Sequence, residues 1–230
     1  GESGGVLGGS GVASSGARVG GGVWVGVGVV RRLRSRDGGW PPPYVGVPAW
    51  RNLETARALM QAGVDVLAEK PLAASLAEAD ELVRLAQSLN RVGQVGHLER
   101  FNPAVRATAP LITQPMFFEV HRLSVFTPRS LDVDVILDLM IHDLDVVLWL
   151  VKSPVKEIRA VGLPILSGKA DIANVRLEFE SGCVANFTAS RVSTERVRKL
   201  RFFQPRQYIS PDYGRQEVLG FSVGGADESA

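Results

Sequence analysis

Cysteine is nearly absent from this chain of 230 residues, in which Cys183 is the only one. A single thiol excludes an internal disulfide framework and a zinc site built on several cysteines, and it suits a reducing compartment. Long apolar runs are missing too, since Val146–Val151 is typical of the longest and a membrane-spanning helix needs about 18 residues. A net charge of only +2 provides no electrostatic attraction to nucleic acid or to a membrane surface. We therefore expect a soluble, cytoplasmic, globular protein with neither kind of partner.

Glycine is plentiful but unevenly distributed, because 15 of the 25 glycines lie in residues 1–46. The same stretch carries five arginines against two acidic residues, and three prolines in a row at 41–43. Gly/Ser/Arg-rich sequence of this kind buries too little apolar area to offset the entropy lost on ordering. We expect residues 1–45 to be poorly specified, with Gly22–Val30 as their one possible strand.

From Val47 onward the pattern becomes regular and alternates between helix and strand. Asn52 is a plausible N-cap for the first helix, and Gly63 stands at its C′ position. Ser75 and Glu78 have the S-x-x-E spacing of a capping box at the start of the second helix. The alternation is typical of a parallel α/β unit with a right-handed crossover. The predicted elements are helices over 52–62 and 75–90 and strands over 64–68 and 93–96.

Beyond Pro110 strands dominate the pattern. They favour an antiparallel sheet, because short turns join them, and a long apolar helix over 132–151 would cover one face of it. The architecture expected is thus an α/β unit followed by an α+β domain. The predicted strands span 116–124, 155–163, 172–180, 183–192, 200–204 and 208–213.

Four titratable side chains share one stripe of the long helix, since Asp134, Asp138, His142 and Asp145 fall within about 80° of one another on a helical wheel. A carboxylate one turn before a histidine can hold the imidazole tautomer and stabilise its protonated form, as an acid/base pair requires. Two other interpretations stay open: a polar stripe that faces water, and a metal shared by His and Asp one turn apart. No second ligand cluster accompanies the stripe, so no metal is assigned.

Lys70 is the second candidate for chemistry. The chain uses arginine for 21 of its 26 basic residues, so lysine is the rarer choice. Unlike arginine, lysine can lower its pKa enough to exchange protons near neutrality. It follows a predicted parallel strand, at the edge where doubly wound sheets bind ligands. The alternative is an ordinary loop lysine beside a turn proline.

Three ordered motifs carry a family resemblance. Ala62–Pro71 (AGVDVLAEKP) resembles the strand and Glu-Lys-Pro signature of the Gfo/Idh/MocA oxidoreductases, and Asp138-x-x-x-His142-x-x-Asp145 resembles their second signature. Gln94–Pro103 (QVGHLERFNP) resembles the segment that joins their two domains. The residues of that segment, together with Asp171-Ile-Ala-Asn174 and Ala189-Ser-Arg191, are most similar to those of family members that act on nucleotide sugars.

The resemblance implies an NAD(P)-dependent dehydrogenase that transfers a hydride between NAD or NADP and a sugar or nucleotide-sugar hydroxyl. It implies a partial Rossmann-type parallel sheet followed by a mostly antiparallel open sheet covered by helices. Residues 46–110 would form the cofactor domain, and residues 111–230 would form the substrate domain and join copies into a homo-oligomer. The implied catalytic residues are Lys70, His142 as proton acceptor and Asp138 as its orienting group; the implied cofactor contacts are Glu69, Lys70 and Pro71, and the implied substrate contacts are His97, Arg100, Asn102 and Asp145.

The glycine motif of a dinucleotide site is incomplete. Gly26-Val-Gly28-Val-Val-Arg31 has arginine at the third glycine position, and Gly9-Ser-Gly11 has no convincing strand before it. The family's Thr-Pro segment with a downstream His before the Glu-Lys-Pro strand is absent as well. We therefore expect a fragment of a larger enzyme with impaired cofactor binding. Two alternatives remain: a cofactor-free oligomerisation or binding module, and a metal-dependent sugar isomerase or hydrolase that uses Asp138 and His142.

Overall fold

The structure, a computed structural model, describes residues 49–127 and 133–224 and, before them, only the backbone of four short strands within residues 17–46. The chain divides into two compact units, residues 1–96 and 97–230. The boundary therefore precedes the one expected at residue 110. The reason is that α3 (Pro103–Thr108) buries Val105 in the core of the second unit. The dinucleotide motifs around Gly9 and Gly26 lie largely outside the described residues.

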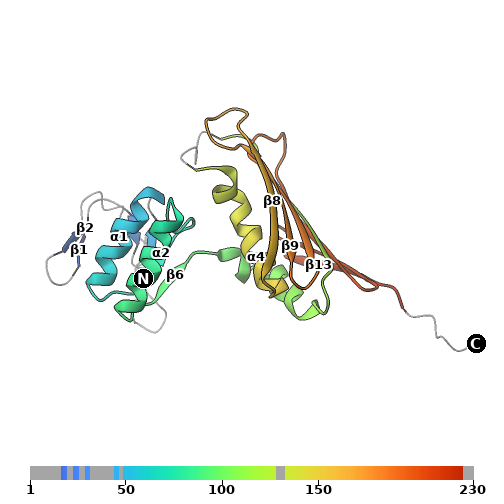
Figure 1. Ribbon diagram of the computed structural model, residues 1–230, viewed down its shortest axis with the longest axis horizontal. Coiled ribbons are helices and arrows are strands. Elements are labelled where there is room, and N and C mark those ends of the chain that lie inside the picture. The colour runs from blue at the N-terminus through green and yellow to red at the C-terminus, as the bar shows by residue number, and fades with distance from the viewer. Residues whose placement is uncertain are drawn as a thin grey trace, which may run out of the picture. The chain divides into compact units, whose positions relative to one another are not determined.

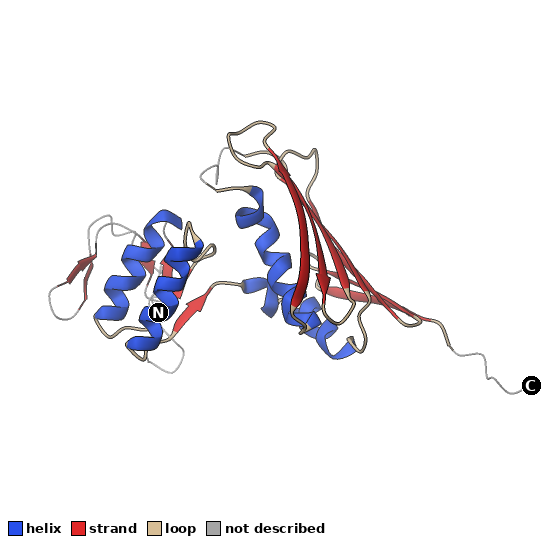
Figure 2. Cartoon of the chain, viewed as in Figure 1, coloured by secondary structure: helices blue, strands red, loops and turns tan. Residues whose placement is uncertain are grey.

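The first unit contains a four-stranded sheet in the order β3-β4-β5-β6. The last three of these strands are parallel to one another, and β3 is antiparallel to β4. Two helices lie side by side over one face of this sheet, where Leu59, Val66 and Leu82 are buried together (Figure 2). The bounds are β3 Val29–Arg31, β4 Tyr44–Gly46, α1 Ala49–Gln61, β5 Val66–Ala68, α2 Leu76–Ser88 and β6 Gly93–Val95.

The single strand expected over Gly22–Val30 is wrong. The structure has two separate strands there, β2 (Val23–Val25) and β3, which belong to different sheets, and β2 pairs with β1 (Ala17–Val19). Glycine weakens a strand because it has no side chain to pack, and Gly26 and Gly28 interrupt the run of valines.

Local capping signals of the first unit are confirmed at two of three positions. Gly63 has φ +77° at the end of α1, and its N–H donates to the carbonyl of Met60. Ser75 accepts the N–H of Glu78 at 3.3 Å and so caps α2. Asn52 is not an N-cap, because α1 begins at Ala49 and the buried Asn52 amide bonds to a distant loop instead.

The second unit is built on a seven-stranded sheet in the order β13-β12-β11-β7-β10-β9-β8, in which only the β7–β10 pair is parallel. This mixed but mainly antiparallel sheet confirms the predicted fold class. The strand β13 was not expected; its apolar side chains Leu219 and Phe221 alternate along the strand but are exposed instead of core-facing. The bounds are β7 Phe117–Leu123, β8 Val155–Leu163, β9 Ile172–Phe179, β10 Val184–Ser190, β11 Val197–Gln204, β12 Gln207–Asp212 and β13 Glu217–Ser222.

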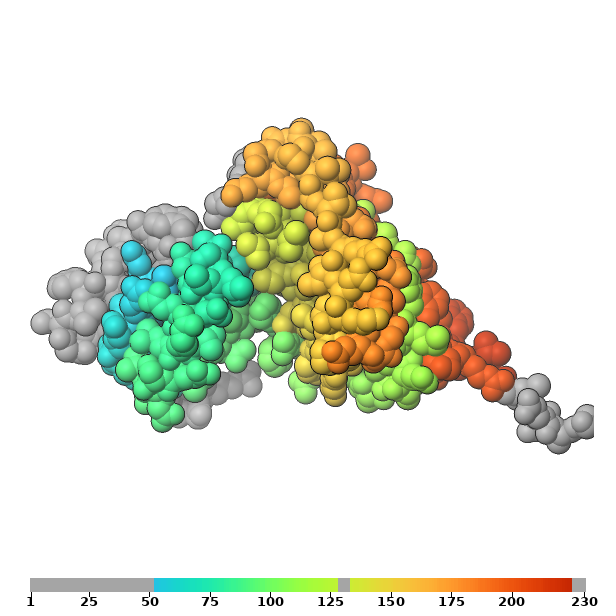
Figure 3. All heavy atoms as spheres, viewed as in Figure 1, coloured from blue at the N-terminus to red at the C-terminus, as the bar shows by residue number. Residues whose placement is uncertain are grey.

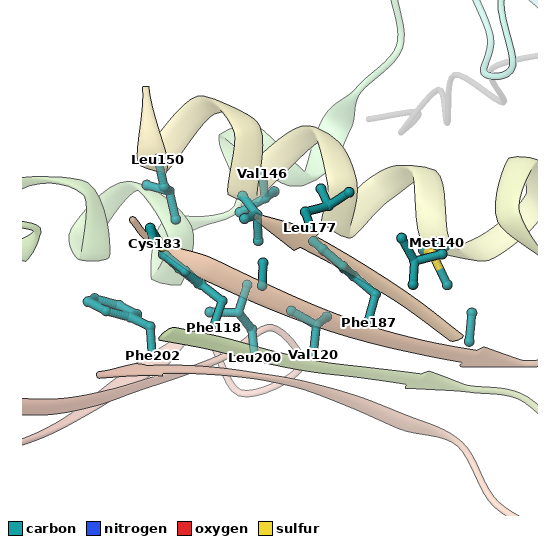
Figure 4. Packing of buried hydrophobic residues seen from close by; sticks show 14 of the residues in the cluster. Phe118, Val120, Met140, Val146, Leu150, Leu177, Cys183, Phe187, Leu200 and Phe202 are labelled. Atoms are coloured by element: carbon teal, nitrogen blue, oxygen red, sulfur yellow. The ribbon is translucent and has the colours of Figure 1, made fainter. Parts of the chain in front are cut away.

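One face of this sheet is covered by α4 (Ile141–Val151) (Figure 1). Alternate residues of β7 point toward that helix, so that Phe118 and Val120 are buried. They meet Val146 and Leu150 of α4 in a continuous apolar core (Figure 4). Burying a side chain of this size stabilises the fold by about 1.5–3 kcal/mol, which makes this core the principal support of α4.

A π-helical turn, η3 (Ile136–Met140), runs directly into α4. The N–H of Ile141 donates to the carbonyl of Ile136, five residues earlier. The long helix predicted over 132–151 therefore starts later and does not keep 100° per residue throughout. A π turn inside a helix is rare and is frequently found at functional sites.

The opposite face of the large sheet is not covered by any helix of the described second unit (Figure 1). One row of it is an aromatic ladder: Phe117, Phe203, Tyr208 and Phe221 lie on adjacent strands with ring centroids 5.3–6.1 Å apart. We call this face the open face. Strand β8 at the sheet edge is exposed along nearly its whole length (Figure 3). No helix in the described part of the chain is long and apolar enough to cross a membrane.

Candidate active site

Lys70 lies in the loop that follows β5, at the carboxyl end of two parallel strands. The neighbouring strand β6 ends beside it, where the N–H of Gly96 donates to the carbonyl of Ala68 at 2.8 Å. The N–H of Lys70 donates to the Glu69 carboxylate at 3.2 Å, and the peptide bond to Pro71 is cis. The structure thus places Glu69, Lys70 and Pro71 at the edge of the sheet where ligands of doubly wound folds bind.

The predicted stripe of four titratable residues is only partly present. Asp134 belongs to the helix start rather than to the stripe, because its carboxylate accepts the N–H groups of Ile136 and Leu137 at 3.0 and 2.9 Å. Asp138 lies within the π turn, and His142 follows in α4, both partly buried. The Asp138/His142 pairing as an acid/base unit remains a prediction.

Asp145 is bound by a residue from the start of the second unit. Arg100, in the short helix η1 (Leu98–Phe101), donates two hydrogen bonds to its carboxylate at 2.6 and 2.5 Å. These bonds raise the pKa of Arg100 above its ordinary value, although partial burial opposes that shift. His97 Nδ1 lies 3.9 Å from the same carboxylate. The structure therefore brings three of the predicted substrate residues together, as a bidentate ion pair with a histidine beside it.

Asn102 has structural partners. Its side chain accepts the N–H of Ala104 at 3.0 Å, which caps α3, and it donates to the carbonyl of Tyr213 at 3.1 Å. These bonds use both ends of the amide and fix the chain between η1 and α3. A substrate contact by Asn102 remains a prediction, since the observed role is that of a cap.

A buried ion pair that the sequence analysis missed joins β7 to α4 within the second unit. Arg122 of β7 forms two hydrogen bonds with Asp143 of α4, at 2.5 and 2.9 Å, and Glu99 lies 3.4 Å from the same guanidinium. The side chains of Arg122 and Asp143 are only 5% and 2% exposed. Burial opposes the charge of Arg122, but Asp143 outweighs it and raises the pKa of Arg122. The sequence did carry a signal that Arg122 is buried: in a strand, alternate residues point to the same face, and Arg122 lies on the face of Phe118 and Val120.

Tyr213 completes this cluster on its other side. The Arg122 guanidinium lies 5.5 Å from the centre of the Tyr213 ring, a cation–π distance. Tyr213 is 4% exposed, and burial raises its pKa well above the ordinary value. The phenol therefore keeps its proton near pH 7, and its ring lies against the Arg122 guanidinium.

Asp171 and Arg191 form a second buried ion pair. Asp171 is fully buried and accepts the backbone N–H groups of Ile165, Leu166 and Ser167 at 2.6–2.8 Å, while Arg191 donates to it at 2.8 Å. The Ser167 hydroxyl and these other donors hold the pKa of Asp171 far below its usual range, although burial opposes the shift. This carboxylate organises the 163–171 loop.

Metal ligands do not converge anywhere in residues 49–127 and 133–224: no group of three or more His, Cys, Asp or Glu side chains could hold an ion there. The metal-dependent isomerase or hydrolase hypothesis therefore receives no support from the described part of the chain.

Comparison with known proteins identifies the class. Residues 84–208 match the family model described as the GFO/IDH/MocA C-terminal domain, and residues 43–97 match that of an oxidoreductase family with an NAD-binding Rossmann fold. The chain belongs to the Gfo/Idh/MocA family of oxidoreductases, which confirms the resemblance seen in its motifs.

The relatives include nucleotide-sugar and inositol dehydrogenases. UDP-N-acetylglucosamine 3-dehydrogenase of Acidithiobacillus ferrooxidans is 41% identical over 167 residues, which cover 72% of this chain and 53% of the relative. Inositol 2-dehydrogenase of Leifsonia xyli subsp. xyli is 34% identical over 106 residues, which cover 43% of this chain and 31% of the relative. The chain thus spans about half or less of the length of these curated relatives.

Solved structures show the same architecture. The structure of the Acidithiobacillus ferrooxidans enzyme has a TM-score of 0.72 at 37% identity, covering 81% of this chain and 64% of that one. An inositol dehydrogenase homologue from Azotobacter vinelandii, solved with NADH and myo-inositol, also has a TM-score of 0.72 at 21% identity, covering 84% of this chain and 56% of that one. The second likeness concerns the fold alone.

Proposed function

We propose that the protein is an NAD(P)-dependent dehydrogenase that oxidises or reduces a hydroxyl-bearing carbon of a nucleotide sugar. The observation that carries the proposal is the Glu69-Lys70-Pro71 loop at the carboxyl edge of parallel strands β5 and β6, in a chain 41% identical to a UDP-N-acetylglucosamine dehydrogenase. The lone buried thiol of Cys183 suits a reducing compartment, and a cytoplasmic location is part of the proposal.

The proposed chemistry assigns each residue one task. When bound, the nicotinamide accepts the hydride that leaves the sugar carbon. The neutral imidazole of His142 takes the proton from the hydroxyl oxygen, and Asp138 one turn earlier orients the ring and stabilises the imidazolium. Lys70 orients the substrate hydroxyl and the nicotinamide ribose. Glu69 and Pro71 shape the loop on the cofactor side.

The described first unit supports only part of a dinucleotide site. Parallel strands and the loop after β5 suit the nicotinamide end of NAD(P), because ligands of such sheets bind at the carboxyl edge. The pyrophosphate requires a glycine-rich turn and a helix N-terminus, and the motif around Gly26 has arginine at its third glycine position. The loop around Lys70 thus suits the nicotinamide end of NAD(P). Binding of the pyrophosphate depends on residues before 44.

Arg100 is the strongest of the substrate residues in this proposal. Its pairing with Asp145 uses two of its five N–H donors, and its side chain is 41% exposed. A planar guanidinium fixed by a carboxylate is well suited to the phosphates of a nucleotide sugar. His97 lies beside the pair, and Asp145 acts by holding Arg100.

Turnover of UDP-N-acetylglucosamine tests the proposal directly. We expect the chain to form NADH when it is given this sugar and NAD⁺ well above the dissociation constant. The Lys70→Ala variant should keep only a small, measurable residual rate, while Lys156→Ala, which removes an exposed lysine of β8, should retain the full rate. Equal NADH formation by both variants would contradict the role of Lys70.

Cofactor affinity is expected to be low in this chain as it stands. The incomplete glycine motif leaves contacts mainly at the nicotinamide end, and these give a dissociation constant of about 1 mM or weaker, near −4 kcal/mol. NADH fluorescence titration measures it. Saturation at tens of micromolar would show that one of the glycine-rich stretches before residue 44 does bind the pyrophosphate.

A homo-oligomer through the open face is the second part of the proposal. The aromatic ladder there leaves Phe203 37% and Phe221 59% exposed, and aromatic side chains are enriched at protein interfaces. This same surface favours the alternative function, a cofactor-free oligomerisation module, if no cofactor binds.

The substitution Phe203→Glu is expected to weaken this association at least about tenfold, because it places a carboxylate in the interface. Light scattering across a concentration series measures the effect. Leu76→Glu, at an exposed position of the first unit, is the matched control. An unchanged mass for Phe203→Glu would rule out the open face as the interface.

A further inference from the structure

Asn52 is a buried amide at an unfavourable place. It lies one turn inside α1 and is 1% exposed. Asparagine disfavours helix interiors because its side chain competes for backbone groups, and a buried amide needs hydrogen-bond partners. A residue that contradicts local preference in this way usually serves something outside its own helix.

The partners of Asn52 are two carbonyls on either side of Lys70. Its Nδ2 donates to the carbonyl of Pro71 at 2.8 Å and to that of Glu69 at 3.4 Å. The Lys70 N–H is itself held by the Glu69 carboxylate. The backbone before and after Lys70 is therefore fixed from α1, 17 and 19 residues away in sequence.

The chemistry of the contact requires a primary amide. One nitrogen carries two N–H donors, so it can serve two carbonyls at once. Serine or threonine has a single donor, and the carboxylate of aspartate has none and would face two carbonyl oxygens. The helix supplies a rigid base, because Ala56 and Leu59 of α1 are almost completely buried against the sheet.

We infer that Asn52 is a positioning residue for Lys70: its amide clamps the loop so that the lysine amine is presented at the carboxyl edge of β5. The clamp itself stands on geometry, and its effect on turnover rests on the proposed dehydrogenase function. A misplacement of about 1 Å in a reacting group can cost up to about 100-fold in rate, so a clamp on this loop has a measurable consequence.

Hydrogen exchange of the full chain tests the clamp without any need for turnover. In Asn52→Asp we expect the amides of Lys70, Leu72 and Ala73 to exchange at least about tenfold faster than in the unaltered chain, with α2 unchanged. Asn90→Asp is the matched control, because it makes the same change at an exposed position of the first unit. Equal loop exchange in both variants would overturn the inference.

Asn52→Ser decides the matter if the aspartate variant does not fold. It is neutral and smaller, and it keeps one donor, so we expect faster loop exchange in a folded protein. Slow exchange of that loop in Asn52→Ser would show that the second donor is unnecessary and that the clamp does not exist as described.

A double-mutant comparison connects the clamp to Lys70. Asn52→Asp should lower kcat at least about tenfold in the unaltered chain and have little further effect in Lys70→Ala, because the group it positions is then absent. The same tenfold loss in both backgrounds would indicate a purely structural role. Absence of turnover in the unaltered chain would contradict the proposed function while leaving the exchange result intact.

Discussion

Replacing His142 by alanine is expected to lower kcat by about 10²- to 10⁴-fold, the usual contribution of a general acid/base group. The imidazole is the proposed acceptor of the hydroxyl proton, and no other histidine lies in α4. The measurement is the steady-state rate with UDP-N-acetylglucosamine at saturating NAD⁺. Because only the proton-transfer step is altered, the loss should appear in kcat rather than in KM.

His121→Ala provides the matched control for this experiment. His121 is on the open face, where it bonds to Glu119 at 3.1 Å, and it should retain kcat. Lys70→Arg should be nearly as damaging as His142→Ala, since arginine keeps the charge but does not share a proton. An unchanged kcat in His142→Ala would make that residue structural and would remove the acid/base assignment.

Arg122→Met is expected to destabilise the second unit by about 3–5 kcal/mol, because it leaves the buried Asp143 carboxylate without its cation. Urea unfolding followed by circular dichroism measures the change. The effect reaches the site as well, since Asp143 follows His142 directly in α4. We therefore expect the folded fraction of this variant to have reduced kcat.

Arg159→Met is the matched control, because it removes the same charge from an exposed ion pair instead of a buried one. Arg159 pairs with Glu157 on exposed strand β8, and loss of such a solvent-screened surface pair should leave the free energy of unfolding nearly unchanged. The double variant Arg122→Met/Asp143→Leu should regain part of the lost stability, because it removes the carboxylate that Arg122→Met leaves unpaired. If Arg122→Met and Arg159→Met were equally stable, the buried pair would not support the fold as described.

Signals that act over a few residues were sufficient to predict much of this fold. Gly63 and the Ser75/Glu78 pair specify helix ends through their own backbone bonds, and the structure confirms both. The alternation of inward residues along β7 likewise follows from strand geometry alone. The mainly antiparallel sheet was predictable because strand patterns joined by short turns act over a similar range, whereas the family was predicted from its three ordered motifs.

Partners far apart in sequence were not predictable. Asn52 has the right residue type for an N-cap, and only the folded chain shows that its amide reaches Glu69 and Pro71. Arg122 and Asp143 look like ordinary surface charges until β7 and α4 bring them together. Lys70 and His142 were predicted as site residues because motifs mark them, whereas Asn52, Arg122 and Asp143 belong to no such motif.

Deleting one residue from Ile136–Met140 would convert the π turn into ordinary α-helix. The segments on both sides would keep nearly the same direction, because about five residues of a π turn and about four of an α turn each close one turn of helix. Asp134 anchors one end of the turn and the Arg122–Asp143 pair anchors the other, so the extra residue is accommodated between two fixed ends. A helical wheel counted at 100° per residue through this turn is therefore out of step by about one residue for Asp134 relative to α4.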